Sequence, residues 1–365
     1  MKSKVKIDRK ETRLRSVLKR AEAGDSLSED EILHLLSIVD EGEREALFAA
    51  ARRVRARHTG QRVFLYGFVY LSTYCRNDCL FCFFRKSNTE SLRYRKTPEQ
   101  IIQAATILAE SGVHLIDLTM GEDPACFAEN KLEDFGDLVA SVEKATGLPV
   151  MISPGVVDEG VLAMLKTSGA SWYACYQETY DRSLFEQIRP GQDFDSRLEK
   201  KRIARKLGLL TEEGMLSGLG ESPTDVARTL CAMGALESDQ IRVMSFVPQV
   251  GTPLSDHPPA DSGEEAKIIA IMRLLFPDRL IPASLDIGGL GGLKERLEAG
   301  ANVVTSLVPP GEGLAGVAQS SLDIHEARRT VAGVEPVLRE CGLQAATKAE
   351  YRRWVKERME SIAGV

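Results

Sequence analysis

The segment from Cys75 to Cys82 holds three cysteines, Cys75, Cys79 and Cys82, at the spacing C-x3-C-x2-C, with the aromatic Phe81 directly before the last one. Cysteine thiolates are the usual ligands of iron–sulfur clusters, and three of them can hold three corners of a [4Fe–4S] cube. The fourth iron is then left without a protein ligand and can bind a small molecule. The spacing therefore predicts a cluster whose open iron takes part in chemistry.

A structural zinc site is the alternative interpretation of the same cysteines. Such a site needs four ligands, which usually come in two pairs. No second Cys-x-x-Cys or His-x3-His follows the segment, and His58 and Cys126, which could supply a fourth ligand, stand at no motif spacing. The loop therefore favours iron–sulfur over zinc, and a zinc-stabilised binding module without chemistry remains the alternative from another class of protein.

Composition excludes several classes of function. The chain has 365 residues, 43% of them hydrophobic, enough for one large or two ordinary domains. Its formal net charge is −6 and its basic residues are dispersed, so nothing indicates nucleic-acid binding. No run of ~18 apolar residues predicts a membrane span, and the charged N-terminus is no signal segment. We expect a cytoplasmic protein, in which seven cysteines indicate metal or redox chemistry rather than disulfides.

Strand-like and helix-like segments alternate after Gly60. The run 63–71 is continuously apolar and aromatic, as in a strand buried on both faces, and the cysteines follow it directly. The predicted strands are 63–71, 114–119, 149–153, 171–176, 213–217, 241–247, 280–285 and 302–306. Helices are predicted to begin at Pro98 and to cover 134–146, 158–168, 196–207, 224–236, 264–275, 292–299 and 322–339.

Eight strands, each followed by a helix, predict an α/β fold with a parallel sheet. Eight such units over roughly 250 residues fit a closed (β/α)8 TIM barrel. An open doubly wound sheet is the alternative, but the glycines of 288–292 lack the G-x-G-x-x-G spacing of that fold. We expect an N-terminal helical extension over 1–60, the barrel over 61–340 and a helical tail over 341–365.

The pattern C-x3-C-x-φ-C after the first strand resembles the signature of the radical S-adenosylmethionine (SAM) superfamily. The resemblance implies a [4Fe–4S] cluster held by the three cysteines, with SAM bound to its open iron and Phe81 against the adenine. One electron from the cluster then splits SAM into a 5′-deoxyadenosyl radical, which abstracts a hydrogen from the substrate. An electron donor such as flavodoxin or ferredoxin would supply that electron.

Further positions match this superfamily. Met120-Gly121-Glu122 resembles the Gly-Gly-Glu motif that binds the amino group of SAM, with Met in place of the first Gly. Glu178, expected to end the fourth strand, and Arg197, expected to open the next helix, match positions that hold SAM. A ligand with both an ammonium and a carboxylate requires both signs of charge. The alternatives are an ordinary tight loop at Gly121 and a solvated helix face for Arg197.

The sequence also resembles a family within this superfamily, methylornithine synthase. The similar segments include 116–124, 151–156, 280–286 and 299–306, and they extend from about Ser28 to the last helix. The resemblance implies a mutase that isomerises L-lysine to (3R)-3-methyl-D-ornithine, by fragmentation and recombination of the carbon skeleton, as the first step of pyrrolysine biosynthesis.

Lysine offers one carboxylate and two ammonium groups, so its pocket needs one cation and two anionic or polar acceptors. The predicted strand ends supply Asp117, Arg242, Ser284 and Asp286. The resemblance implies that Arg242 binds the carboxylate, Ser284 and Asp286 the α-ammonium, and Asp117 the side-chain ammonium. The alternative is a structural ion pair between Asp117 and Arg242, which would be costly to bury.

Two other radical enzymes remain as rivals. A biotin-synthase-like sulfur inserter would bury a second [2Fe–2S] cluster on cysteines of inner strands, but only Cys175 lies on a predicted strand. A hydrogenase-maturation-type enzyme would share the architecture.

Overall fold

The computed structural model describes residues 2–128, 131–309 and 329–363. Its core is a parallel sheet with the strand order β6-β5-β4-β3-β2-β1-β8-β7. The strands are β1 (Arg62–Ser72), β2 (Leu115–Met120), β3 (Val150–Ser153), β4 (Ala170–Ala174), β5 (Leu210–Ser217), β6 (Gln240–Ser245), β7 (Pro282–Ser284) and β8 (Val303–Leu307).

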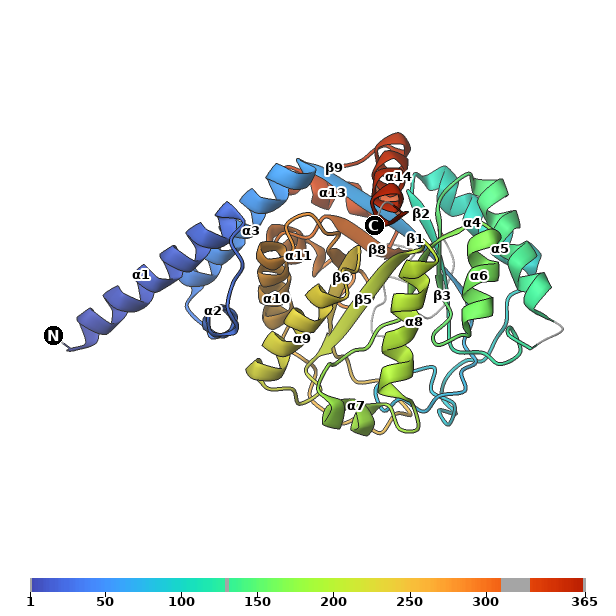
Figure 1. Ribbon diagram of the computed structural model, residues 1–365, viewed down its shortest axis with the longest axis horizontal. Helices are drawn as coiled ribbons and strands as arrows, with labels where there is room; N and C mark the ends of the chain where they lie inside the picture. Colours follow the sequence, from blue (N-terminus) through green and yellow to red (C-terminus); the bar gives the residue numbers. More distant parts are fainter. Residues whose placement is uncertain (1, 129–130, 310–328, 364–365) are drawn as a thin grey trace.

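The two ends of this order meet and close the sheet into a ring. Leu280, just before β7, forms a parallel bridge with Gln240 of β6. Its carbonyl accepts a hydrogen bond from the Ile241 N–H at 3.0 Å, and its own N–H donates to the Asp239 carbonyl at 3.1 Å. Figure 1 shows the strands surrounded by helices. The predicted (β/α)8 barrel is confirmed.

The helices that follow the strands are α4 (Pro98–Ser111), α5 (Leu132–Thr146), α6 (Glu159–Thr167), α8 (Phe194–Lys206), α9 (Pro223–Ala235), α10 (Ser262–Leu275), α11 (Leu293–Glu298) and α13 (Val331–Glu340). Local sequence signals explain where a helix begins. At α4, Thr97 and Gln100 form a capping box and Pro98 occupies the first turn. The predicted start of the last of these helices, at 322, lies outside the described residues.

Four details differ from the sequence prediction. An additional short helix, α7 (Arg182–Ile188), stands between β4 and α8, and an additional strand, β9 (Gln344–Ala345), pairs with β1. The fourth strand ends at Ala174, so Glu178 lies beyond the strand instead of ending it. The chain there leaves the β4 ladder, and Glu178 bridges to Met215 of β5 instead. Asp286 likewise lies two residues after β7.

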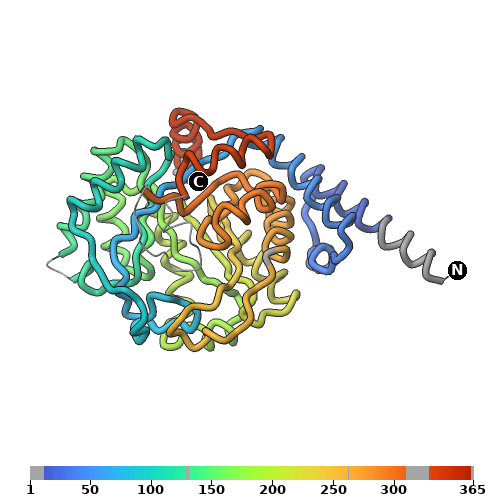
Figure 2. Tube along the Cα trace, turned by 180° about the vertical axis from the view of Figure 1, so that it is seen from behind, coloured from blue at the N-terminus to red at the C-terminus, as the bar shows by residue number. Residues whose placement is uncertain are grey.

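The two terminal regions cover different parts of the barrel. At the N-terminus, α3 (Glu41–Thr59) packs on α10 and α2 (Glu29–Leu36) packs on α9, while α1 (Lys2–Ala23) runs outward (Figures 1 and 2). At the C-terminus, α14 (Lys348–Ala363) covers the end of the barrel where the strands begin. There the Tyr351 and Tyr66 hydroxyls lie 2.8 Å apart. The proposed division into three parts stays a prediction.

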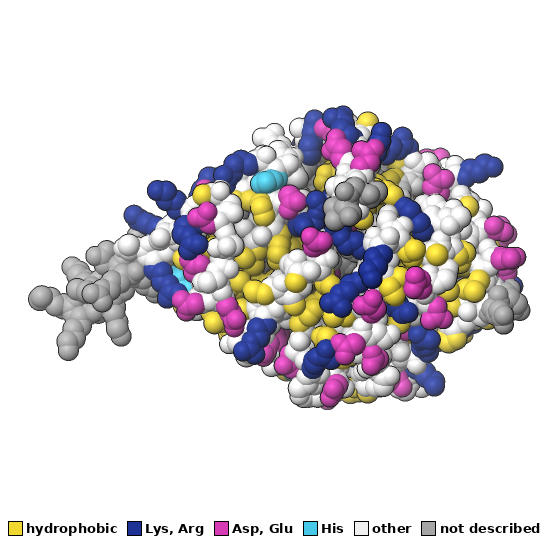
Figure 3. Space-filling model, in the orientation of Figure 1, with side chains coloured by type: hydrophobic (Ala, Val, Ile, Leu, Met, Phe, Trp, Pro, Cys, Tyr) yellow, Lys and Arg dark blue, Asp and Glu magenta, His cyan; other side chains and the backbone are white. Residues whose placement is uncertain are grey.

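The surface is of mixed charge. Figure 3 shows Lys and Arg interspersed with Asp and Glu over the visible face. Among the described residues, no helix combines the length and apolar character needed to cross a membrane.

Candidate active site

The cysteines lie on the long connection from β1 to α4, which has no helix or strand of its own over 73–94. The Arg93 guanidinium holds this cysteine loop in shape. It donates to the carbonyl oxygens of Phe84 at 2.9 Å, Arg85 at 2.5 Å and Asn88 at 3.1 Å. A planar group with five N–H donors is suited to fixing several carbonyls at once. The loop is therefore ordered by its own side chains rather than by a sheet ladder.

A cavity of about 220 Å³ lies at the C-terminal end of the barrel, where barrel enzymes build their active sites. All three loop cysteines line it. Of the other predicted site residues, Phe81, Gly121, Glu122, Glu178, Arg197 and Asp286 also line it. Asp117, Arg242 and Ser284 are buried behind this lining, each next to a residue that does reach the cavity.

The cysteines fit a four-iron cluster better than a single metal ion. Among the described residues, no three His, Cys, Asp or Glu side chains converge on one point as a lone zinc requires. The cysteines of a [4Fe–4S] cube bind three different irons and need no common centre. Burial raises the pKa of the Cys75 thiol, and burial with the neighbouring cysteines raises that of Cys82. Metal binding would therefore displace thiol protons.

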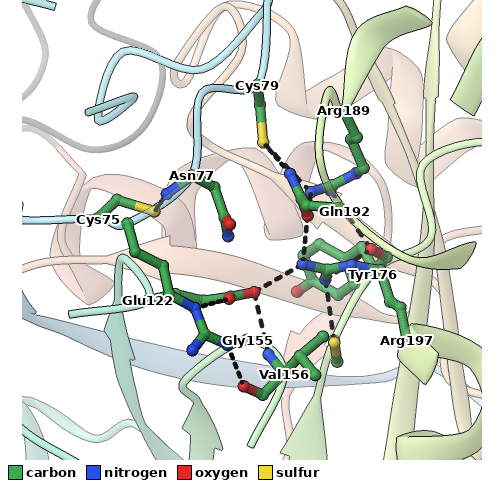
Figure 4. A network of polar contacts seen from close by, with 12 residues as sticks. Cys75, Asn77, Cys79, Glu122, Gly155, Val156, Tyr176, Arg189, Gln192 and Arg197 are labelled. Atoms are coloured by element: carbon green, nitrogen blue, oxygen red, sulfur yellow. Dashed lines mark hydrogen bonds and ion pairs between the residues drawn. The ribbon is translucent and has the colours of Figure 1, made fainter. Parts of the chain in front are cut away.

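Glu122 joins the cysteine loop to the barrel (Figure 4). Its Oε1 accepts from Arg197 Nη2 at 2.7 Å and from the Val156 N–H at 3.0 Å, and its Oε2 accepts from Arg76 Nε at 3.0 Å. Burial alone would raise the pKa of this carboxyl, but Arg197, the Val156 N–H, Asn77 and Arg76 outweigh it and lower the pKa. Glu122 is therefore an ionised carboxylate at neutral pH.

Two glycines make room for this arrangement. A Cβ on Gly121 would lie 2.3 Å from the Tyr74 carbonyl oxygen, so only glycine lets β2 approach the cysteine loop. A Cβ on Gly155 would lie 2.1 Å from Glu122 Cγ, and Gly155 has a φ of +76°. Gly121 therefore has a packing reason that is independent of any bound ligand.

Arg197 and Glu178 belong to one buried charge cluster, in which Arg189 and Gln192 connect them. Arg197 belongs to the first turn of α8, and its side chain is only 5% exposed, so the alternative of a solvated helix face is wrong. Its Nη1 also lies 3.0 Å from Cys175 Sγ. Glu178 pairs with Arg189 at 3.0 Å, while its Oε2 has no hydrogen-bond partner among the described residues. Burial raises the pKa of Glu178 despite Arg189.

The deeper charges form a second cluster. Arg242 Nε pairs with Glu212 Oε1 at 2.5 Å, and the Tyr176 hydroxyl donates to Glu212 Oε2 at 2.9 Å. Within the described residues Asp117 and Arg242 form no ion pair, and Asp117 Oδ2 and Arg242 Nη2 have no hydrogen-bond partner. Burial, with the charge of Glu212, raises the pKa of Asp117 to about 8. Two buried groups of opposite character thus keep an open hydrogen-bonding position.

Asp286 has several buried hydrogen-bond partners that the sequence did not predict. It accepts from Arg329 Nη2 at 3.0 Å, from the Tyr70 hydroxyl at 3.1 Å and from the Ser306 hydroxyl at 2.7 Å. The Ser284 hydroxyl is the most distant contact, at 3.5 Å. Asp286 and Ser284 are therefore in contact, but the carboxylate already has a buried cationic partner.

Sequence reasoning missed four residues of these clusters: Arg189, Gln192, Glu212 and Arg329. A signal existed only for Glu212, because Glu212 and Glu213 are consecutive charges in an otherwise uncharged strand. Arg189 and Gln192 lie between α7 and α8, where no motif was evident, and Arg329 is distant in sequence from the residue that it pairs with.

The chain is similar to several known proteins. A model of the radical SAM superfamily matches residues 69–230. The chain is 44% identical to 3-methylornithine synthase of Methanosarcina acetivorans, over 90% of this chain and 93% of that one. It is 32% identical to the [FeFe] hydrogenase maturase subunit HydE of Thermotoga maritima, over 74% and 77%. A crystal structure of methylornithine synthase (PylB) superposes with a TM-score of 0.88 at 41% identity, over 92% and 99%.

The close approach at Gly155 gives a test of Glu122. We expect Gly155→Ala to push the carboxylate away from Arg197 and to weaken SAM binding to the cluster-loaded protein at least tenfold. Gly160→Ala is the matched control, because nothing lies within 4 Å of a Cβ there. Isothermal titration calorimetry with SAM measures both. Equal SAM affinity in the two variants would remove Glu122 from the SAM site.

Proposed function

Because this chain belongs to the 3-methylornithine synthase family of radical SAM enzymes, we propose that it isomerises L-lysine to (3R)-3-methyl-D-ornithine, the first step of pyrrolysine biosynthesis. The observation that carries the proposal is the 44% identity over 90% of the chain to a protein of that name. As a radical SAM enzyme it uses a [4Fe–4S] cluster and SAM, which together supply a 5′-deoxyadenosyl radical. The chain's own residues bind, orient and enclose the reactants.

At the mouth of the cavity, the residues fit the polar end of SAM. Cys75, Cys79 and Cys82 would hold three irons. The ionised Glu122 would accept from the ammonium, and the Arg197 guanidinium would donate to the carboxylate. Glu178 Oε2, buried and without a partner among the described residues, is a further acceptor, and Phe81 would lie against the adenine.

At the base of the cavity, the open hydrogen-bonding positions fit a lysine zwitterion. Arg242 Nη2 would donate to the carboxylate, since its Nε is already fixed by Glu212. Asp117 Oδ2 would accept from the side-chain ammonium. The Ser284 hydroxyl, with Asp286 behind it, would accept from the α-ammonium. The two ends of the substrate would thereby be held apart while its skeleton rearranges.

Enclosure is part of the chemistry, because two fragments must recombine before either escapes. At the opposite end of the barrel, α14 closes the access with stacked aromatic rings, and the ring centroids of Trp354 and Trp172 lie 5.8 Å apart. This closure favours retention of the fragments.

An electron donor must reach the cluster from outside. The cysteine loop and its continuation present the exposed basic side chains of Arg76, Lys86 and Arg95, in a chain with a net charge of −6. We propose a small acidic donor such as flavodoxin or ferredoxin, because opposite charges steer such encounters.

Lysine turnover tests the proposed reaction. Incubation of the cluster-loaded enzyme with lysine, SAM and dithionite should give a branched isomer of unchanged mass, resolved from lysine by chromatography and mass spectrometry. Arg242→Lys should lower kcat/KM at least tenfold, because an ammonium cannot bind Glu212 and a carboxylate through the fixed geometry of a guanidinium. Arg339→Lys, at a side chain 67% exposed, is the control. SAM cleavage with only unreacted lysine recovered would contradict the proposal.

The raised pKa of Asp117 predicts a pH dependence of lysine binding. The carboxyl is mostly protonated at pH 7, because its pKa is about 8, and only the ionised form attracts an ammonium strongly. Lysine affinity should therefore rise about several-fold between pH 7 and pH 8.5. Asp117→Asn should abolish this rise while leaving SAM affinity unchanged. A wild-type dissociation constant for lysine that is flat over this range would exclude Asp117 from the site.

A further inference from the structure

Gln192 lies between a predicted cluster ligand and two buried arginines (Figure 4). Its Nε2 lies 3.0 Å from Cys79 Sγ. Its Oε1 accepts from Arg197 Nη2 at 2.9 Å and from Arg189 Nη1 at 3.2 Å. One amide therefore contacts the cysteine loop on one side and the charge cluster of the cavity on the other.

The orientation of this amide follows from its neighbours. A guanidinium has only donors, so the two arginines require the amide oxygen on their side. The NH2 group then has to face Cys79, whose sulfur is the acceptor. If the amide were reversed, its NH2 group would face the N–H donors of both arginines, and no hydrogen bond could form there. The two arginines thus fix the orientation in which the Gln192 NH2 group points toward the Cys79 sulfur.

Cys79 differs in this respect from the other two cysteines. Within the described residues it is the one cysteine of the three that has side-chain donors, from Gln192 and, at 3.5 Å, from Arg189 Nη1. Cys75 Sγ has a backbone N–H, that of Asn77, at 3.5 Å. Cys79 is also the most buried of the three. Donors act most strongly on the charge of a buried sulfur.

We infer that Gln192 raises the reduction potential of the cluster by donating this hydrogen bond to the Cys79 thiolate. Reduction adds one electron from the external donor, converting the 2+ cluster to the 1+ state, and no bond is made or broken. The added negative charge spreads onto the sulfur ligands, and hydrogen bonds to them stabilise the reduced state. Two guanidiniums on the amide oxygen polarise the amide and strengthen its N–H as a donor.

Gln192 is therefore a tuning residue that acts through Cys79, and its role does not depend on the identity of the substrate. The inference needs only the cluster on the three cysteines. A failure of lysine turnover would leave it untouched, and a failure of the tuning would leave the proposed mutase reaction untouched.

Redox titration of the cluster, followed by electron paramagnetic resonance with SAM and lysine absent, tests this inference. Gln192→Leu should lower the ratio of reduced to oxidised cluster at fixed potential about tenfold, which for one electron is a shift of about 59 mV to more negative values. Gln192→Glu keeps the oxygen that the arginines bind but places a second oxygen against the sulfur, so its potential should fall at least as far.

Gln187→Leu is the matched control, because Gln187 is exposed on α7 and its side chain contacts Ser183 instead of the cluster loop. It should keep the wild-type potential. Iron content confirms that each variant carries a full cluster, and if Gln192→Leu loses iron, Gln192→Glu decides alone. A wild-type potential in a fully loaded Gln192→Glu protein would overturn the inference.

Discussion

The carboxylate of Glu122 holds the catalytic end of the barrel together. It binds Arg197 of α8, the backbone N–H of Val156 after β3, and Arg76 of the cysteine loop. The backbone carbonyl of the same residue accepts from the Arg76 N–H at 3.0 Å. A buried charge is costly unless it is fully paired, and here two cations and one N–H meet that requirement. This ionised group therefore ties the cysteine loop to the barrel at the cavity.

The charged side chains around the cavity are arranged in two levels. The upper level, near the cysteines, is rich in cations and suits the anionic end of a cofactor and a negatively charged cluster. The lower level holds the Glu212–Arg242 and Asp286–Arg329 pairs, with Asp117 beside them. These pairs cancel most of the buried charge, and Asp117 Oδ2 and Arg242 Nη2 keep no hydrogen-bond partner among the described residues. In the proposed reaction an elongated zwitterion would satisfy both, and the two ends of the amino acid would thereby be oriented.

Features encoded by local sequence were predictable and distant partners were not. The run 63–71 of β1 is continuously apolar, strand-like and helix-like segments alternate after it, and the cysteine spacing is contained in one loop, so these features could be recognised without a structure. The extra helix α7 is too short for a clear period, and β4 ends early because the chain turns to contact β5. The pairing of Asp286 with Arg329 joins residues far apart in sequence. Gln192 belongs to no motif, and only the folded chain places it beside Cys79.

Cys75, Cys79 and Cys82 would leave one iron of the cluster open, and SAM would bind that iron. Electron–nuclear double resonance on the reduced cluster, with SAM labelled by ¹⁵N at its amino group, tests this directly. The expected result is a hyperfine coupling from the labelled nitrogen, strong enough to show that this nitrogen is bound to iron. A fully loaded and reduced cluster that gives no such coupling with saturating SAM would contradict it.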